Sequence, residues 1–284
     1  MNALCCQGLP WVLAFALACP LQETVNTSPN KNEVPFELIR GFVIEFAGSV
    51  GGLEGLRFIL DTGANCSVVD RRIAERLGIR LHPAKLFDFD RTTIASEGTF
   101  PEVRFGPVIL KDVTLRSTEL HRLSSFAKGA DAIIGTDLLS LVNLAVDYDQ
   151  NKLFFWPLEQ SVSSAKSHGL GLIVQLRIQE QPIEVLLDTG VERLVLFKER
   201  LERDVPHLLI GKEEKRVVIG LETPATEVAL PGIYLGAEEI NAKVLLVKGP
   251  EARVLPGIDG YLGVSALNAH RVEFDISGNR LRWQ

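Results

Sequence analysis

The sequence predicts a mainly β protein of two similar small lobes, each a closed β-barrel with one or two short helices, with a cleft between them. Two observations predict this class. The chain repeats one series of short motifs at near-identical spacing, which indicates a duplicated fold. Its apolar segments are short, rich in β-branched residues and separated by Gly and Pro, which is typical of strands and turns.

Three motifs carry the repeat, in the same order in each half. The first is an apolar run that ends in Asp-Thr-Gly, the second an apolar pair before Gly, and the third an Asp beside aromatic or aliphatic residues. The spacing from the first motif to the second is nearly the same in both halves, and the spacing from the second to the third is identical. The motifs are Phe58–Ala64 and Val185–Val191, Asp131–Gly135 and Asp259–Gly263, and Val146–Tyr148 and Phe274–Ile276.

The repeat also sets the expected domain boundaries. We expect an N-terminal lobe at 33–158 and a C-terminal lobe at 168–284. The segment 159–167 is rich in Ser and is expected to be a linker. Ahead of the first lobe we expect a signal peptide at 1–18 and a flexible linker at 19–32.

The N-terminal segment predicts export. Leu9–Leu21 is almost wholly apolar but too short to cross a bilayer as a helix. Ala16-Leu17-Ala18 fits the small-x-small pattern of signal-peptide cleavage. Together with Cys19 it also resembles a bacterial lipoprotein box. We therefore expect a periplasmic, extracellular or lipid-anchored envelope protein, with membrane anchoring through a lipidated Cys19 as the alternative to a soluble form.

Within the lobes, short apolar or β-branched segments between turns rich in Gly and Pro predict strands, and a few helically spaced segments predict short helices. Each helix is expected next to a motif: one follows the first Asp-Thr-Gly, and the other two each follow the Gly of a second motif. The expected strands include Phe42–Phe46, Val108–Leu115, Leu172–Leu176 and Lys243–Val247, and the expected helices are Asp70–Leu77, Thr136–Val142 and Val264–Ala269.

Composition excludes several classes of function. The net charge is −6 and the basic residues are scattered, which argues against a nucleic-acid partner. The 5 histidines show no metal-ligand spacing, so we expect neither a metal nor a cofactor. Three of the 4 cysteines, Cys5, Cys6 and Cys19, lie close to the N-terminus, so no disulfide framework is expected. Cys66 is interpreted as a small buried residue.

The paired Asp-Thr-Gly segments suggest the chemistry. Two carboxylates held about 3 Å apart cannot both ionise easily and share one proton. One can then act as general base on a water molecule while the other acts as general acid toward a carbonyl. The Gly permits a close turn that exposes backbone N–H groups, and the Thr hydroxyl can bond to the opposite loop.

With these motifs the chain resembles the retropepsin-like (retroviral-type) aspartic protease family, in the bacterial form with both lobes in one polypeptide, from about Phe42 to Trp283. The resemblance implies an aspartic endopeptidase in which Asp61 and Asp188 activate a water molecule. It implies a peptide or protein substrate, no cofactor, and a monomer that suffices for activity because both Asp residues are in one chain. The loop residues that would support this dyad are Thr62, Gly63, Ala64, Thr189, Gly190 and Val191.

The resemblance also implies a hairpin flap in each lobe. In the first lobe we expect it at Thr92–Pro107 with its tip at Ser96–Thr99, and in the second at Val217–Gly232. The candidate flap and substrate-contacting residues are Asn65, Ser96, Glu97, Gly98 and Glu192.

The second loop departs from the family pattern. Val191 stands where the family prefers Ala, Ser or Thr, and Glu192 adds a carboxylate near the dyad, beside Arg193. The lobes are therefore asymmetric. This asymmetry keeps an alternative open, in which the protein is a catalytically weak or inactive two-barrel module that binds peptides.

Overall fold

The computed structural model describes residues 32–88, 91–122, 127, 129–157, 171–205, 215–219, 223–240, 243–249 and 255–284. The expected signal peptide at 1–18, nearly all of the flexible linker at 19–32 and the interlobe linker at 159–167 lie outside these residues. No helix in the described part is long and apolar enough to span a bilayer. The same residues contain no cluster of three metal-ligating side chains.

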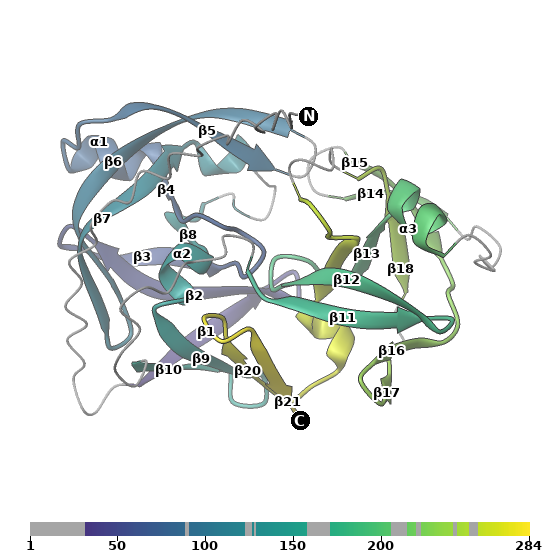
Figure 1. Ribbon diagram of the computed structural model, residues 1–284. Coiled ribbons are helices and arrows are strands. Elements are labelled where there is room, and N and C mark those ends of the chain that lie inside the picture. The colour runs from purple at the N-terminus through teal and green to yellow at the C-terminus, as the bar shows by residue number, and fades with distance from the viewer. Residues whose placement is uncertain are drawn as a thin grey trace, which may run out of the picture.

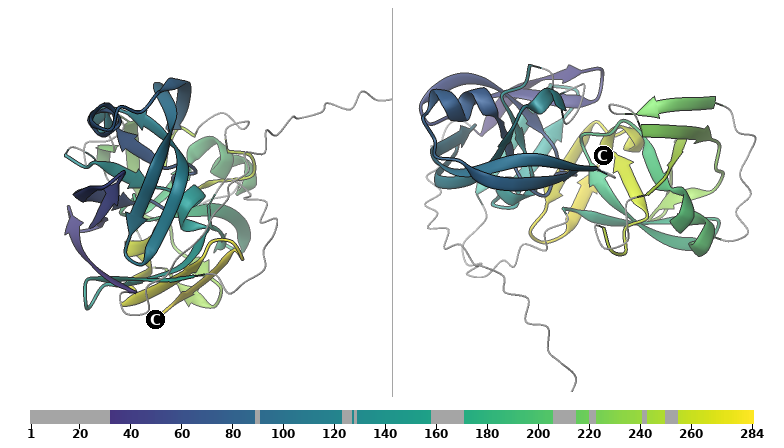
Figure 2. Two further views of the ribbon diagram at one scale, coloured as in Figure 1. Left: turned by 90° about the vertical axis from the view of Figure 1, so that its left-hand side faces the viewer. Right: turned by 90° about the horizontal axis from the view of Figure 1, so that it is seen from above.

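The protein is mainly β, as predicted, with its two halves side by side (Figures 1 and 2). The first half contains ten strands, two short α-helices and one 3₁₀ turn among the described residues. They are β1 (Glu33–Ile39), β2 (Val43–Val50), β3 (Leu53–Leu60), β4 (Val68–Asp70), α1 (Arg71–Arg76), β5 (His82–Asp88), β6 (Arg91–Phe105), β7 (Val108–Thr118), η1 (Leu120–Arg122), β8 (Ala132–Ile134), α2 (Thr136–Leu139), β9 (Val142–Asp147) and β10 (Lys152–Pro157).

The second half follows the same plan, and most of its strands are shorter. Its elements are β11 (Ile173–Ile178), β12 (Gln181–Asp188), β13 (Leu194–Phe197), α3 (Lys198–Asp204), β14 (Lys215–Ile219), β15 (Thr223–Val228), β16 (Ile233–Leu235), β17 (Glu238–Glu239), β18 (Val244–Val247), β19 (Gly260–Gly263), η2 (Val264–Leu267), β20 (Arg271–Asp275) and β21 (Arg280–Trp283). The helix α3 is the counterpart of α1 and is not among the predicted helices. The helix expected at Val264–Ala269 is a short 3₁₀ helix.

The sheets are not the closed barrels that the sequence predicts. One sheet has 12 strands and includes strands of both halves, and the other has 9 strands in the order β14-β15-β18-β13-β19-β12-β11-β16-β17. In the first half β6 is continuous. Its C-terminal end pairs with β2, so the sheet bends back on itself. In the second half the corresponding strand is interrupted between Val228 and Ile233. Pro231 has no N–H to donate and Gly232 has a φ of 69°, so the chain leaves the ladder there.

The structure also places the hairpin tip of the first half elsewhere than the sequence predicts. Strands β5 and β6 form a hairpin that turns between Asp88 and Arg91, so the tip is not at Ser96–Thr99. Ser96, Glu97 and Gly98 lie inside β6, where β5 pairs with the first two and β7 with all three. Gly98 is a site of close approach: a Cβ there would lie 2.7 Å from the Ile79 side chain. The second flap, expected at Val217–Gly232, overlaps the hairpin β14–β15, which begins two residues earlier at Lys215.

The two halves share one antiparallel sheet, with the strand order β1-β10-β9-β20-β21. Strand β9 of the first half pairs with β20 of the second, and Figure 1 shows these strands meeting between the lobes. Ala145 pairs with Glu273, the residue at its own position in the repeat. The approximate twofold axis that relates the halves therefore passes through this pair of residues.

Burial along the strands shows why this sequence forms them. Residues of β11 alternate between buried and more exposed from Ile173 to Ile178, which matches a sheet with one face against the core. Strands β13 and β19 are buried at every residue, because both of their faces are covered. The largest apolar cluster runs through both halves, with Phe58 and Leu187 among its buried members.

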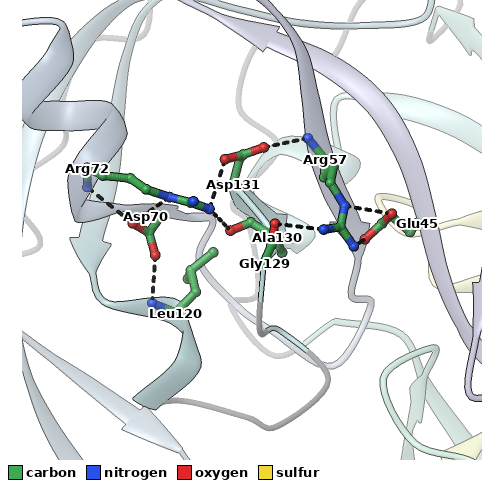
Figure 3. Close-up of polar contacts among 8 residues, drawn as sticks. All are labelled: Glu45, Arg57, Asp70, Arg72, Leu120, Gly129, Ala130 and Asp131. Carbon is green, nitrogen blue, oxygen red and sulfur yellow. Dashed lines mark hydrogen bonds and ion pairs between the residues drawn. The ribbon is translucent and has the colours of Figure 1, made fainter.

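The Asp that begins each second motif anchors a parallel strand pair. Asp131 donates its N–H to the Arg57 carbonyl, and its Oδ2 accepts the Arg57 N–H, each at 2.8 Å. Asp259 does the same with Glu184, at 2.6 and 2.9 Å. In the first half the other carboxylate oxygen of Asp131 accepts from Arg72 at 3.0 Å (Figure 3). These bonds fix the register of β3 on β8 and of β12 on β19.

Close backbone contact at Gly260 yields a test of this strand pairing. A Cβ on Gly260 would lie 2.1 Å from the Val195 carbonyl oxygen, and backbone cannot move aside as a side chain can. We expect Gly260→Ala to lower the free energy of unfolding by about 3 kcal/mol, measured by denaturant titration. The control Gly52→Ala meets no atom within 4 Å at a φ of 82° and should cost only about 1–2 kcal/mol of backbone strain. Equal costs would show that β19 is not packed as described.

Candidate active site

Each Asp-Thr-Gly segment begins where a buried strand ends. Strand β3 leads into the first loop, Asp61–Cys66, and β12 leads into the second loop, Asp188–Arg193. The last residues of both strands are buried, so the strands cannot shift toward solvent. The Asp61 N–H donates to the Ile134 carbonyl at 3.0 Å, and Asp188 pairs with Gly263 on β19. The second motif of each half thus holds the backbone at the Asp itself.

The two loops are joined by four hydrogen bonds that involve Thr62 and Thr189, two between the threonines and two from their hydroxyls to backbone carbonyls. The Thr62 N–H donates to Thr189 Oγ1, and the Thr189 N–H donates to Thr62 Oγ1, both at 3.1 Å. Each hydroxyl then donates to a carbonyl across the interface, Thr62 to Leu187 at 2.9 Å and Thr189 to Leu60 at 2.8 Å. Both threonines are buried, so water cannot replace these bonds.

The interlock brings the two carboxylates face to face across the glycines. A Cβ on Gly63 would lie 2.3 Å from Asp188 Oδ2, and a Cβ on Gly190 would lie 3.3 Å from Asp61 Oδ2. Each carboxylate therefore packs on the backbone of the opposite loop. Glycine is required at position 63 because any side chain there would occupy the space of the Asp188 carboxylate. Asp61 and Asp188, which lie in different halves of the sequence, form one site.

Backbone amides solvate these carboxylates from within each loop. Asp61 Oδ1 accepts the N–H groups of Gly63 and Ala64, both at 3.0 Å. Asp188 Oδ1 accepts the Gly190 N–H at 2.6 Å. Burial raises the pKa of the Asp61 carboxyl, while the amides of Ala64 and Gly63 and a hydrogen bond with Asp188 act in the opposite direction. The net effect is a pair of carboxyls in which one retains a proton at pH values where an exposed Asp is ionised.

The Gly of each second motif packs behind the loop of its own lobe. A Cβ on Gly135 would lie 2.8 Å from the Ala64 carbonyl oxygen, and a Cβ on Gly263 would lie 2.5 Å from that of Val191. These glycines serve packing and do not approach the carboxylates. Val191 itself is half-buried against an apolar cluster that includes Leu186. Its extra methyl groups therefore have a place to pack.

Two residues that the sequence did not identify brace the first loop from below. Ser67 donates its N–H to Asp137 Oδ2 at 2.8 Å and its hydroxyl to Asp137 Oδ1 at 2.6 Å. The Gly135 N–H donates to the same Ser67 hydroxyl oxygen at 2.9 Å. Burial raises the pKa of the Asp137 carboxyl. In the second lobe Ser265, the counterpart of Asp137, donates to the Glu192 carbonyl at 2.5 Å.

The remaining candidate residues lie at the edge of the site. Asn65 is exposed. The Glu192 side chain is also exposed and lies 3.6 Å from Arg193 Nε. The Arg193 guanidinium makes its shorter contact elsewhere, with Glu227 at 2.5 Å, so Arg193 is shared between the two carboxylates. The Cys66 thiol is half-buried, and burial together with Asp137 raises its pKa to about 11, so it is predominantly protonated at neutral pH.

Comparison with known proteins agrees with the resemblance drawn from the sequence. Residues 46–138 match the model of an aspartyl protease family, and this segment holds the first Asp-Thr-Gly loop, the β5–β6 hairpin and the second motif. The match confirms the retropepsin-like resemblance for this part of the chain and supports aspartic protease activity in general. No curated protein sequence matches the chain.

The threonine interlock can be tested by stability. Thr62→Val removes the hydroxyl that accepts the Thr189 N–H and donates to the Leu187 carbonyl. Both partners then stay buried without a hydrogen bond, so we expect a loss of about 3 kcal/mol of unfolding free energy in a denaturant titration. Thr62→Ser keeps the hydroxyl and is the matched control, with a loss of about 1 kcal/mol for the missing methyl group. A Val variant as stable as the Ser variant would rule out the interlock as a stabilising contact.

Proposed function

We propose, from the premise that residues 46–138 match the aspartyl protease family, that the protein is a single-chain aspartic endopeptidase. Its dyad would consist of Asp61 and Asp188, one from each lobe. A water molecule held between the carboxylates would attack the scissile carbonyl of a peptide or protein substrate. No cofactor takes part in this proposal, and one chain suffices because it supplies both carboxylates.

The observation that carries this proposal is the reciprocal packing of the two loops. Asp188 lies against Gly63, Asp61 lies against Gly190, and the threonines between them are hydrogen-bonded in both directions. An isolated Asp-Thr-Gly turn has little diagnostic value, because Asp and Gly are common turn residues. Two such turns that meet at their carboxylates form the geometry needed for one proton shared between two acids.

The reaction follows from that shared proton. The ionised carboxylate accepts a proton from the water as its oxygen attacks the carbonyl carbon. The protonated carboxyl donates its proton to the carbonyl oxygen, which gives a neutral tetrahedral diol. Collapse of the diol breaks the C–N bond while a proton moves to the leaving nitrogen, and the dyad returns to its singly protonated form. The raised pKa of Asp61 supports the presence of this form.

The rival function is a peptide-binding module that kept the fold and lost turnover. Nothing in binding alone requires two buried carboxylates to face each other, and an apolar pair would cost less to bury. Val191, the main departure from the family pattern, packs on an apolar cluster. These points favour the protease over the binding module.

The setting of the enzyme is a further part of the proposal. We propose export through the apolar segment at Leu9–Leu21, with cleavage after Ala18 or lipidation at Cys19. The mature protein would then act in the periplasm, at the envelope or outside the cell. Its substrate would be a polypeptide rather than a nucleic acid, because the chain is acidic and its basic residues are scattered.

Substitution of either dyad residue tests the proposed function. Asp61→Asn and Asp188→Asn should each lower cleavage of a peptide library by about 10³-fold or more, scored by mass spectrometry, because the dyad works as a unit. Asp112→Asn, an exposed Asp in the same lobe as Asp61, is the matched control and should retain full activity. If Asp188→Asn keeps most of the activity, the second loop is not catalytic. If the wild-type protein binds peptides but cleaves none across a wide pH range, the binding-module alternative takes its place.

A further inference from the structure

The base of each hairpin carries a glutamate at the same structural position. Glu97 pairs with His82, the first residue of β5, and Glu227 pairs with Lys215, the first residue of β14. On the other side Glu97 pairs with Arg116 of β7, and Glu227 pairs with Leu245 of β18. The ladders therefore identify Glu97 and Glu227 as counterparts, and Arg116 and Leu245 as counterparts.

Each glutamate forms an ion pair with an arginine, but the arginines come from different positions. In the first lobe Arg116 Nη1 donates to Glu97 Oε2, and the backbone N–H of Arg116 donates to the carbonyl of Ser67, the residue after Cys66, at 3.1 Å. In the second lobe Arg193 Nη1 donates to Glu227 Oε2 at 2.5 Å. Arg193 follows Asp188 at the same spacing as Cys66 follows Asp61.

The arginine that pairs with the glutamate thus stands at a different position in each lobe. The first lobe has arginine on the strand and a small residue, Cys66, in the loop, whereas the second has Leu245 on the strand and Arg193 in the loop. The glutamate is constant. Both lobes have the ion pair although its arginine comes from different positions. This indicates that the contact has a role beyond local packing.

Burial and charge make the second pair the stronger one. The Glu227 side chain is only 10% exposed, and Lys243 Nζ reaches its other oxygen at 3.1 Å. The hydrogen bonds of Lys243 and Arg193 lower the pKa of the Glu227 carboxyl. In the first lobe the Glu97 side chain is 40% exposed, whereas Arg116 and Arg193 are equally exposed, at 33% each.

We propose that Glu97 and Glu227 are positioning residues, whose ion pairs with Arg116 and Arg193 hold the base of each hairpin against the Asp-Thr-Gly loop of its lobe. This inference rests on the proposed protease function, in which the hairpins bound the substrate beside the dyad. In the second lobe the tether is direct, because Arg193 belongs to the loop itself. In the first lobe it runs through Arg116, whose side chain pairs with Glu97 of β6 and whose N–H donates to the Ser67 carbonyl directly after the loop.

The first test moves the arginine of the first lobe from the strand to the loop. Its readout is amide hydrogen exchange, which can be measured whether or not the protein is an active enzyme. Arg116→Leu should speed exchange at residues 82–97 by about fivefold, the equivalent of an ion pair worth about 1 kcal/mol. Adding Cys66→Arg rebuilds the arrangement of the second lobe and should restore slow exchange. The hairpin β14–β15 of the same molecules is the internal control and should not change. If Cys66→Arg leaves exchange fast in a folded protein, the proposal is wrong.

The second test breaks the pair in the other lobe and separates KM from kcat. Arg193→Gln should speed exchange at residues 215–219 and 223–227 and raise KM for a cleaved peptide by about fivefold. The kcat value should stay within about twofold, since the threonine interlock holds the dyad independently. Arg193→Lys keeps a cation and should recover part of the loss.

The outcomes of the two tests are distinguishable. Faster exchange that is rescued by the transferred arginine, in a wild-type protein that cleaves no peptide, would support the tether and reject the protease function. Full cleavage with unchanged KM and unchanged exchange in Arg193→Gln would reject the tether and leave the protease function standing.

Discussion

The hydrogen bonds between Thr62 and Thr189 are the interaction on which the rest of the site depends. They bring the ends of β3 and β12 together at the approximate twofold axis and leave each carboxylate no place except against the opposite glycine. The bonds are buried and use both the donor and the acceptor capacity of each hydroxyl. Neither valine nor alanine could replace threonine here without leaving buried polar groups unpaired.

Two facing carboxylates are costly to bury, and the surrounding structure is arranged to offset that cost. Amides of Gly63, Ala64 and Gly190 donate to them, and in the proposed dyad a shared proton would remove one of the two charges. The β9–β20 pairing adds continuous backbone hydrogen bonds between the lobes at a distance from the dyad. The lobes are therefore held together at two places along the axis, at the threonine interlock beside the carboxylates and at the β9–β20 strand pair.

Local patterns in the sequence predict the parts of the site that are repeated. The two Asp-Thr-Gly segments and the two glycines of the second motif lie where the spacing predicts, because matched spacing in a duplicated chain implies matched positions in space. The predicted flap tip is wrong because Gly98 lies in a strand that passes close to Ile79 rather than in a turn. The open sheet of the second lobe depends on Pro231 and Gly232. These two residues interrupt the strand that would otherwise close the sheet, and this outcome depends on how all the strands pair.

Contacts between distant residues could not be predicted in this way. The Ser67–Asp137 brace and the Arg193–Glu227 pair each join residues from separate elements. In the sequence Arg193 is next to Glu192. Only the packing of β15 beside the second loop shows that Glu227 is the nearer carboxylate. The counterpart position of Arg116 and Leu245 follows from strand register, which the sequence alone does not fix.

The central claim is that one chain supplies both halves of the dyad, since the interlock joins Thr62 and Thr189 within the same molecule. Specific activity measured across a wide dilution series tests this claim most directly. A dyad assembled within one chain gives an activity per molecule that stays constant as the protein is diluted. An activity per molecule that falls with dilution, as it does when an active dimer dissociates, would contradict the account.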